Sequence, residues 1–205
     1  MKLKVCGLSK SEDVKTCVFN KVNFCGFILN FPKSHRFISL EDAKVLTSLR
    51  KQETKFVGVL VRPDESELEI FSKLNLDYFQ LYGNYDNEEL LDIKKKYKKK
   101  IIMTIQVNNK KDVENYKKIE KGSDIILWDS SGYQESLSWD FNWIKTVSTK
   151  KEKMIAGNIT MEKLSNLTNL ADIIDVSGAL ETNKVKDTNK IKKFINKIEQ
   201  LNNEN

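Results

Sequence analysis

The sequence predicts an α/β protein folded as a single (β/α)₈ barrel, and three observations lead to that fold class. Short runs of β-branched or aromatic residues alternate with amphipathic helical segments, and eight such units follow one another along the chain. Residues 56–61 are apolar throughout, as is typical of a parallel strand with both faces buried. A helix after each strand implies right-handed crossovers, and eight units match a closed barrel better than an open sheet.

The length and composition fit one domain. The chain has 205 residues, of which 40% are hydrophobic and 31% charged, and no linker divides it. We therefore expect residues 1–205 to form one barrel domain with a frayed C-terminus. No apolar run reaches the length of a membrane span, and the N-terminus lacks a signal-peptide apolar region. Cys6, Cys17 and Cys25 have no metal-binding or redox spacing, which indicates reduced thiols in the cytoplasm.

The net charge of +6 raises the question of nucleic-acid binding. Most of this charge comes from lysines on presumed outer helix faces, notably at 94–100 and after Lys184. Such lysines usually form a solvated face, so we expect neither nucleic acid nor a membrane as a partner.

The first four strand–helix units are delimited by recognisable start and stop signals. Residues 9–13 supply a start signal for the first helix, with Glu12 and Asp13 in its first turn. Ser39-Leu40-Glu41-Asp42 resembles a capping box, and Pro63 ends the third strand. The expected elements are strand 3–5, helix 11–19, strand 24–29, helix 39–49, strand 56–61, helix 64–74, strand 78–81 and helix 87–97.

The second half repeats the alternation with weaker helices and one long irregular connection at 130–140. Its last helix has a clear amphipathic period. The expected elements are strand 101–107, helix 111–119, strand 125–128, a short helix near 141–147, strand 154–156, helix 161–167, strand 173–176 and helix 190–201.

In a (β/α)₈ barrel the site is built where each strand passes into its following loop. Those positions are Cys6 and Gly7, residues 30–37, Arg62, Tyr82 and Gly83, Gln106, Asp129, Gly157 and Asn158, and residues 177–181. The set contains a thiol, a carboxylate and an arginine. Small residues follow the last two strands, where exposed backbone N–H groups can bind a phosphate.

Taken singly, each candidate has an ordinary alternative. A free cysteine such as Cys6 is most often a small buried hydrophobe. Asp129 is either an acid kept protonated by apolar neighbours or a residue that bonds the following turn. Arg36 suits a planar carboxylate but could equally be a surface arginine. His35 is the only histidine and is expected to face solvent, so histidine-based catalysis and multi-histidine metal sites are poorly supported.

The segment Lys4-Val5-Cys6-Gly7-Leu8 is similar to the opening motif of the phosphoribosylanthranilate isomerase family of tryptophan biosynthesis. Further matches follow in order along nearly the whole chain. They are Gly26-Phe27-Ile28, residues 34–39, residues 57–61, Leu76-Asp77, Gln80-Leu81-Tyr82-Gly83, Leu127-Trp128-Asp129, Phe141-Asn142-Trp143, Ala156-Gly157-Asn158 and Asp175-Val176-Ser177.

The resemblance implies an Amadori rearrangement of N-(5-phosphoribosyl)anthranilate to 1-(2-carboxyphenylamino)-1-deoxyribulose 5-phosphate, without metal or organic cofactor. It also implies that Cys6 is the general base, Asp129 the general acid, and Arg36 the partner of the anthranilate carboxylate. The other substrate-binding positions it implies are Gly7, Gln80, Gly157, Asn158, Ser177 and Gly178. The expected partner is a small phosphosugar, bound by a monomer or homodimer.

The chain also departs from the family pattern. Residues 133–140 replace a Gly-Gly-x-Gly-Lys loop, and Tyr82 and Gln106 stand where the family often has His and Arg. Asn158 and Ala179 stand where it usually has Gly, and glycine geometry at either position would matter for phosphate binding. Two alternatives therefore stay open: a barrel isomerase for another phosphosugar, and a non-catalytic phosphometabolite-binding protein of the same fold.

Overall fold

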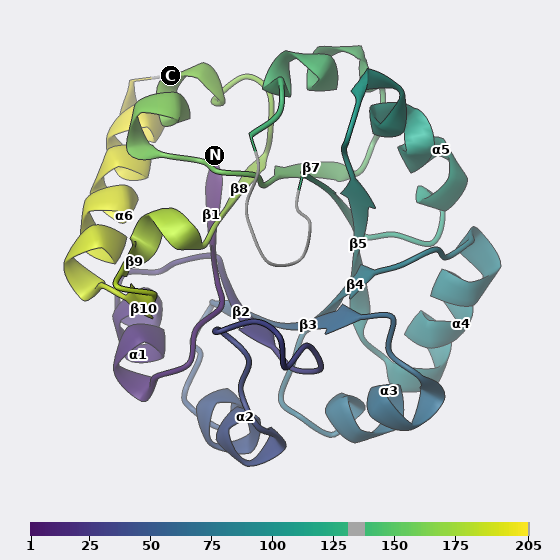
Figure 1. Cartoon of the computed structure of the whole chain (residues 1–205). Helices are drawn as coiled ribbons and strands as arrows, with labels where there is room; N and C mark the ends of the chain where they lie inside the picture. Colours follow the sequence, from purple (N-terminus) through teal and green to yellow (C-terminus); the bar gives the residue numbers. More distant parts are fainter. Residues whose placement is uncertain (131–137, 205) are drawn as a thin grey trace.

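The computed structural model describes residues 1–130 and 138–204, and it confirms the predicted barrel. Figure 1 shows a closed ring of strands with the helices arranged around its outside. The strands are parallel and follow the order β1 to β8, and β8 pairs with β1 to close the barrel. They are β1 (Lys2–Cys6), β2 (Phe24–Ile28), β3 (Lys55–Val61), β4 (Tyr78–Tyr82), β5 (Lys100–Gln106), β6 (Ile125–Asp129), β7 (Glu152–Ile155) and β8 (Ile173–Val176).

Several strands begin one or two residues before the predicted start. β1, β3, β5 and β7 open on Lys2, Lys55, Lys100 and Glu152, because backbone pairing continues past the last apolar side chain to the rim. A hydrophobic pattern cannot detect these charged first residues.

The helices of the first half are α-helices, as predicted, and three of them have side-chain N-caps. Ser39 accepts a hydrogen bond from the Asp42 amide, and Asp64 and Asp86 each form a reciprocal capping box. The first helix begins at Ser11 with Glu12 and Asp13 in its first turn, as predicted, but it has no side-chain cap. These helices are α1 (Ser11–Phe19), α2 (Leu40–Thr47), α3 (Glu65–Ser72) and α4 (Asn87–Tyr97).

The second half is less regular than predicted. The expected helix at 111–119 is a 3₁₀-helix followed by one α-turn, and the next two are 3₁₀-helices. In chain order the elements are η1 (Lys110–Asn115), α5 (Tyr116–Ile119), η2 (Phe141–Thr146), η3 (Met161–Asn166), η4 (Gly178–Leu180), β9 (Glu181–Thr182), β10 (Val185–Lys186) and α6 (Thr188–Asn203). The hairpin of β9 and β10 was not predicted. α6 starts two residues early because Asp187 caps it.

The barrel interior is filled by alternate residues of each strand, because successive side chains point to opposite faces. At the amino end of the strands these residues form an apolar cluster, here called the lower layer. It includes Phe24, Val57, Tyr78, Ile102, Ile125, Leu127, Met154 and Ile173. At the carboxyl end Cys6, Val59, Tyr82 and Asp129, here called the upper layer, are also buried. The upper layer, which contains the polar side chains, thus lies directly above the packed apolar lower layer.

Outside the barrel, Lys95, Lys96 and Lys98 are exposed, so the predicted solvated lysine face on α4 and its end is confirmed. Across residues 1–130 and 138–204, every helix is too short or too polar to traverse a bilayer.

Candidate active site

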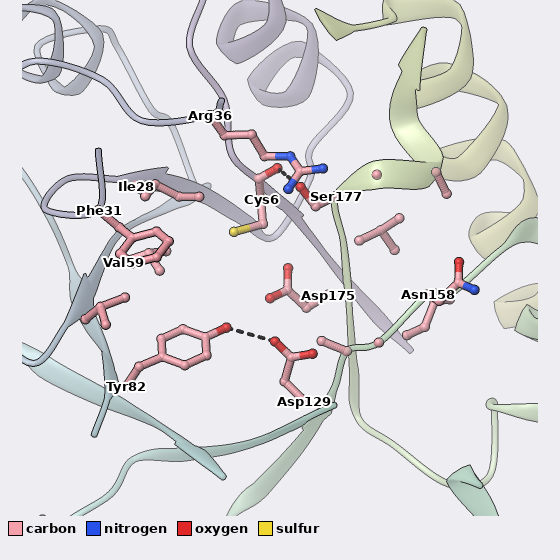
Figure 2. Close-up of a pocket in the computed structure, with 17 residues that line it drawn as sticks. Cys6, Ile28, Phe31, Arg36, Val59, Tyr82, Asp129, Asn158, Asp175 and Ser177 are labelled. Carbon is pink, nitrogen blue, oxygen red and sulfur yellow. Dashed lines mark hydrogen bonds between the residues drawn. The ribbon is translucent and has the colours of Figure 1, made fainter. Parts of the chain in front are cut away.

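A cavity of about 150 Å³ opens at the carboxyl end of the strands (Figure 2). Side chains from both halves of the barrel line it, so the cavity belongs to the closed barrel rather than to one segment. The lining residues are Cys6, Ile28, Phe31, Arg36, Val59, Val61, Tyr82, Asp129, Ala156, Gly157, Asn158, Ile159, Asp175, Val176, Ser177, Gly178 and Ala179. Of the site residues that the resemblance implies, only Gly7 and Gln80 are absent from this lining. The strand-end positions Arg62, Gly83 and Gln106 are also absent from it.

Cys6 ends β1 and directs its thiol into the cavity, although the residue is only 8% exposed. Burial raises the pKa of the Cys6 thiol, and the nearby Lys4 ammonium partly offsets that effect. A Cβ on Gly26 would lie 3.0 Å from Cys6 Sγ and 3.1 Å from Lys4 Nζ. The glycine on the neighbouring strand therefore leaves the space that both groups occupy.

Lys4 and Asp175 form a buried ion pair beside the thiol. Lys4 Nζ donates to Asp175 Oδ2 at 2.8 Å, and Lys4 is completely buried. Burial opposes the charge on Lys4, but Asp175 and Cys6 together raise the pKa of the lysine. Asp175 lines the cavity, and its buried Oδ1 has no hydrogen-bond partner among the residues described. The pair keeps a positive charge close to Cys6.

Asp129 ends β6 on the opposite side of the cavity from Cys6, with Asp175 between them (Figure 2). The residue is 7% exposed, and it accepts a 2.9 Å hydrogen bond from the Tyr82 hydroxyl. Gln80 Nε2 donates to that hydroxyl at 3.2 Å from within the barrel. Burial and the Asp129 charge raise the pKa of Tyr82 well above its usual value, so this phenol stays neutral and donates. Gln80 thus supports Tyr82 instead of lining the cavity.

Arg36 lies in the loop after β2 and is held by Glu181, which was among the predicted strand-end positions 177–181 but had no predicted role. Its Nε donates to Glu181 Oε1 at 2.6 Å and its Nη2 to Glu181 Oε2 at 2.9 Å, a bidentate arrangement. A Cβ on Gly7, whose φ is +75°, would overlap the Arg36 stem. Gly7 therefore admits Arg36 rather than lining the cavity. His35 is exposed, as predicted, and its Nε2 lies 3.2 Å from Glu181 Oε2.

The loop after β7 uses the left-handed backbone region at two successive residues. Gly157 has φ +112° and Asn158 has φ +45°. A Cβ on Gly157 would lie 2.7 Å from Ser130 Oγ and 2.9 Å from the Trp139 ring, so glycine is required there. Asparagine is among the residues that tolerate positive φ, so Asn158 maintains the geometry expected of the usual glycine.

The loop after β8 does not need glycine geometry at the position that departs from the family. Ala179 lies in η4 and is not among the residues with positive φ. The departure at Ala179 therefore causes no backbone strain. Of the altered loop at 133–140, residues 133–137 lie outside the described part of the chain. Ser138 Oγ accepts hydrogen bonds from Asn158 Nδ2 and Lys163 Nζ.

Four polar residues beside the cavity had no predicted role, namely Lys4, Asp175, Glu181 and Lys186. Lys4 and Asp175 each interrupt an apolar strand, and that interruption was the available signal. Glu181 was included only as the last of the strand-end positions 177–181, and Lys186 was not included, because both stand in two-residue strands that have no detectable period. In the part of the chain that the structure describes, no group of three or more His, Cys, Asp or Glu side chains could hold a metal ion.

Comparison with known proteins points to one family. The family model described as N-(5′-phosphoribosyl)anthranilate isomerase matches residues 3–197. An N-(5′-phosphoribosyl)anthranilate isomerase from Streptococcus mutans is 33% identical over 202 residues, covering 97% of this chain and 99% of the relative. One from Clostridium kluyveri is 31% identical over 206 residues, covering 98% and 99%.

Solved structures agree with the sequence relatives. The phosphoribosylanthranilate isomerase of Thermotoga maritima has a TM-score of 0.84 at 26% identity, covering 98% of this chain and 99% of that one. A phosphoribosylanthranilate isomerase in complex with reduced 1-(o-carboxyphenylamino)-1-deoxyribulose 5-phosphate has a TM-score of 0.79 at 25% identity, with the same coverage.

Proposed function

Because the chain belongs to the N-(5′-phosphoribosyl)anthranilate isomerase family, we propose that it catalyses the Amadori rearrangement of N-(5-phosphoribosyl)anthranilate in tryptophan biosynthesis. One observation carries the proposal. A thiol at the end of β1 and a carboxyl at the end of β6 face each other across one cavity, which also contains an arginine and two loops suited to a phosphate.

In the proposed reaction Asp129 acts as the acid and Cys6 as the base. Asp129 enters this step protonated on the carboxyl oxygen that does not accept from Tyr82. It gives that proton to the furanose ring oxygen, the bond from that oxygen to C1′ breaks, and the open chain becomes an iminium ion. The Cys6 thiolate then removes the proton from C2′, and the electron pair moves to form an enolamine. Protonation at C1′ and loss of the hydroxyl proton at C2′ give the ketone. The scheme needs proton transfers only, each typically worth about 10²–10⁴-fold.

Cys6 must be ionised to accept a proton, although its burial favours the thiol. Besides a smaller contribution from the Lys186 ammonium, which lowers the pKa of Cys6, two positive charges support the thiolate. Lys4 is permanently beside it in the ion pair with Asp175, and the iminium ion forms next to it during the reaction. Because the second charge exists only after ring opening, the base becomes strongest at the step that uses it.

The remaining predicted residues divide between the two anionic ends of the substrate. Arg36 is assigned to the anthranilate carboxylate, since a guanidinium fork matches a planar carboxylate. The loops at Gly157-Asn158 and Ser177-Gly178 are assigned to the phosphate, since left-handed backbone and short loops expose N–H groups. Gly7 and Gln80 act through Arg36 and Tyr82.

We further expect the protein to act in the cytoplasm as a monomer or homodimer. One related structure is of monomers generated from dimeric phosphoribosylanthranilate isomerase of Thermotoga maritima. The expected partner is the small phosphosugar alone, and the scheme requires no nucleic acid.

The test is loss of anthranilate fluorescence with enzymatically generated substrate. Wild type should convert the substrate, whereas the kcat of Cys6→Ala and of Asp129→Asn should be lower by about 10²–10⁴-fold. Cys17→Ala is the matched control, because Cys17 is a buried thiol on α1 outside the cavity. No turnover by wild type, or full turnover by both site variants, rejects the proposal. Tight binding of a reduced product analogue without turnover would indicate a phosphometabolite-binding protein instead.

A further inference from the structure

We infer that Glu181 and Lys186 are positioning residues, which fix the Arg36 guanidinium so that its outer edge meets the substrate carboxylate. The inference deepens the proposed function and rests on it, because it takes Arg36 as the carboxylate partner. Neither residue reaches the reacting atoms in this role. Glu181 acts through Arg36, and Lys186 acts through Glu181 and through the loop that follows β8.

The hydrogen bonds to Glu181 leave one particular edge of Arg36 available. A guanidinium has five N–H donors, and the carboxylate of Glu181 uses the Nε–Nη2 side. Nη1 has no hydrogen-bond partner within residues 1–130 and 138–204, and the second N–H of Nη2 lies on the same outer edge. The N–H groups on that edge can donate to both oxygens of a second carboxylate. Arg36 also lines the cavity. Glu181 thereby orients the guanidinium without occupying its outer edge.

The hairpin of β9 and β10 explains why Glu181 has a fixed position. Glu181 pairs directly with Lys186, and Thr182 with Val185, so only Asn183 and Lys184 form the turn. Both turn residues have positive φ, 51° and 63°, as a type I′ turn requires. Opposite charges at directly paired positions then meet across the hairpin, and Lys186 Nζ contacts Glu181 Oε1. The Lys186 side chain is only 1% exposed, so this contact is screened little by water.

Lys186 extends the same cluster to the catalytic strand. Its Nζ donates to the backbone oxygen and to the hydroxyl of Ser177, both at 3.3 Å. Ser177 Oγ in turn donates to the Cys6 backbone oxygen at 2.9 Å (Figure 2). On the other side, the Arg36 stem lies against Gly7, directly after Cys6. Arg36 is therefore tied from both sides to the end of β1, which sets its distance from the base.

The charges of the cluster suit an anionic ligand. Burial lowers the pKa of Lys186, although the Glu181 carboxylate favours its charged form. With Arg36 and Lys186 positive and Glu181 negative, these three groups together carry one net positive charge. Burial opposes ionisation of Glu181, but the hydrogen bonds from Arg36 and the charge of Lys186 lower its pKa to about 2. The carboxylate is therefore ionised throughout the neutral range. Without it, two cations would repel each other and the guanidinium would lose its orientation.

The experiment measures kcat and KM for wild type, Glu181→Gln, Arg36→Met and the double variant. Glu181→Gln keeps the shape but removes the charge-assisted pairing, so KM should rise about tenfold while kcat changes less than about threefold. Because Glu181 acts only through Arg36, Arg36→Met combined with Glu181→Gln should bind no worse than Arg36→Met alone. Glu152→Gln is the matched control, since it removes the partner of Lys2 at the opposite rim.

The outcomes separate the two proposals. If wild type shows no turnover, the function and the positioning role fall together. If wild type turns over but Glu181→Gln leaves KM unchanged, only the positioning role is rejected. Additive losses in the double variant would also reject it. Should Glu181→Gln fail to fold, Glu181→Asp, which retains the charge but retracts the carboxylate, should raise KM in the same way, and an unchanged KM there is equally decisive.

Discussion

In the lower layer of the barrel Ile125 and Leu127 pack among apolar neighbours from the other strands, whereas two residues further along β6 the upper layer has Asp129. Both layers are buried, and both are built from the inward-facing positions of the same strands. Strand β4 repeats the contrast, with Tyr78 below and a hydrogen-bonded Tyr82 above.

The difference shows how one barrel separates stability from chemistry. Apart from the hydroxyl of Tyr78, lower-layer side chains lose only apolar surface on burial, which stabilises the fold. The polar side chains inside the barrel must be desolvated, and some are incompletely satisfied. Gln80 Oε1, Thr104 Oγ1 and Asp175 Oδ1 have no hydrogen-bond partner among the residues described. Such unsatisfied groups lower the free energy of unfolding, and the burial of the apolar lower layer has to offset that loss. We therefore expect upper-layer changes to reduce activity and lower-layer changes to reduce stability.

The largest effect should come from Asp129→Asn. The amide retains the size of the side chain but cannot supply the proton for ring opening, so kcat should fall by about 10²–10⁴. The melting temperature should change little, because the volume of the upper layer is unchanged. Steady-state kinetics and calorimetry on the same sample check both parts. A large loss of thermal stability with intact turnover would reverse the assignment of the two layers.

Leu127→Ala, two residues earlier on the same strand, should have the opposite profile. Leu127 is completely buried in the lower layer, so its truncation leaves a cavity and should cost about 2–5 kcal/mol of unfolding free energy. The kcat of the protein that remains folded should stay close to wild type. Urea unfolding gives the first quantity, and turnover per folded molecule gives the second. A tenfold fall in kcat per folded molecule would show that the layers are not separable.

Tyr82→Phe tests a supporting contact within the upper layer. It removes the hydroxyl that donates to Asp129, so the acid loses part of its orientation, and kcat should fall about tenfold with little change in KM. Tyr78→Phe is the matched control, because Tyr78 is the lower-layer tyrosine of the same strand. Equal losses in the two variants would contradict a specific role for Tyr82.

The barrel and the strand ends that form the site could be predicted from the sequence. Eight buried strands separated by helical segments leave few topologies, and the barrel then places Cys6 and Asp129 at one end. The 3₁₀-helices of the second half could not be distinguished from α-helices, since a single turn of either has nearly the same apolar spacing.

Contacts across the barrel could not be predicted from the sequence, for a different reason. Tyr82 and Asp129 come from β4 and β6, which are not adjacent, so their hydrogen bond depends on barrel curvature. Glu181 and Lys186 depend on a hairpin of two-residue strands, too short to have a period. Arg36 could thus be predicted as a candidate binding residue, but the contacts that hold it could not.

The smallest effect should be a pH dependence of stability that comes from the charged cluster of Arg36, Glu181 and Lys186 and not from the lower layer. The pKa of Glu181 is lowered from 4.5 to about 2, so its ionised form favours the folded chain. That contribution is fully present above about pH 4.5 and is lost as pH falls toward 2. Urea unfolding of Glu181→Gln should therefore show a deficit against wild type at pH 7 that shrinks between pH 4.5 and 2. Leu127→Ala should show the same deficit at every pH, because no proton is linked to it. A Glu181→Gln deficit that is constant with pH would mean that the carboxylate contributes shape rather than charge.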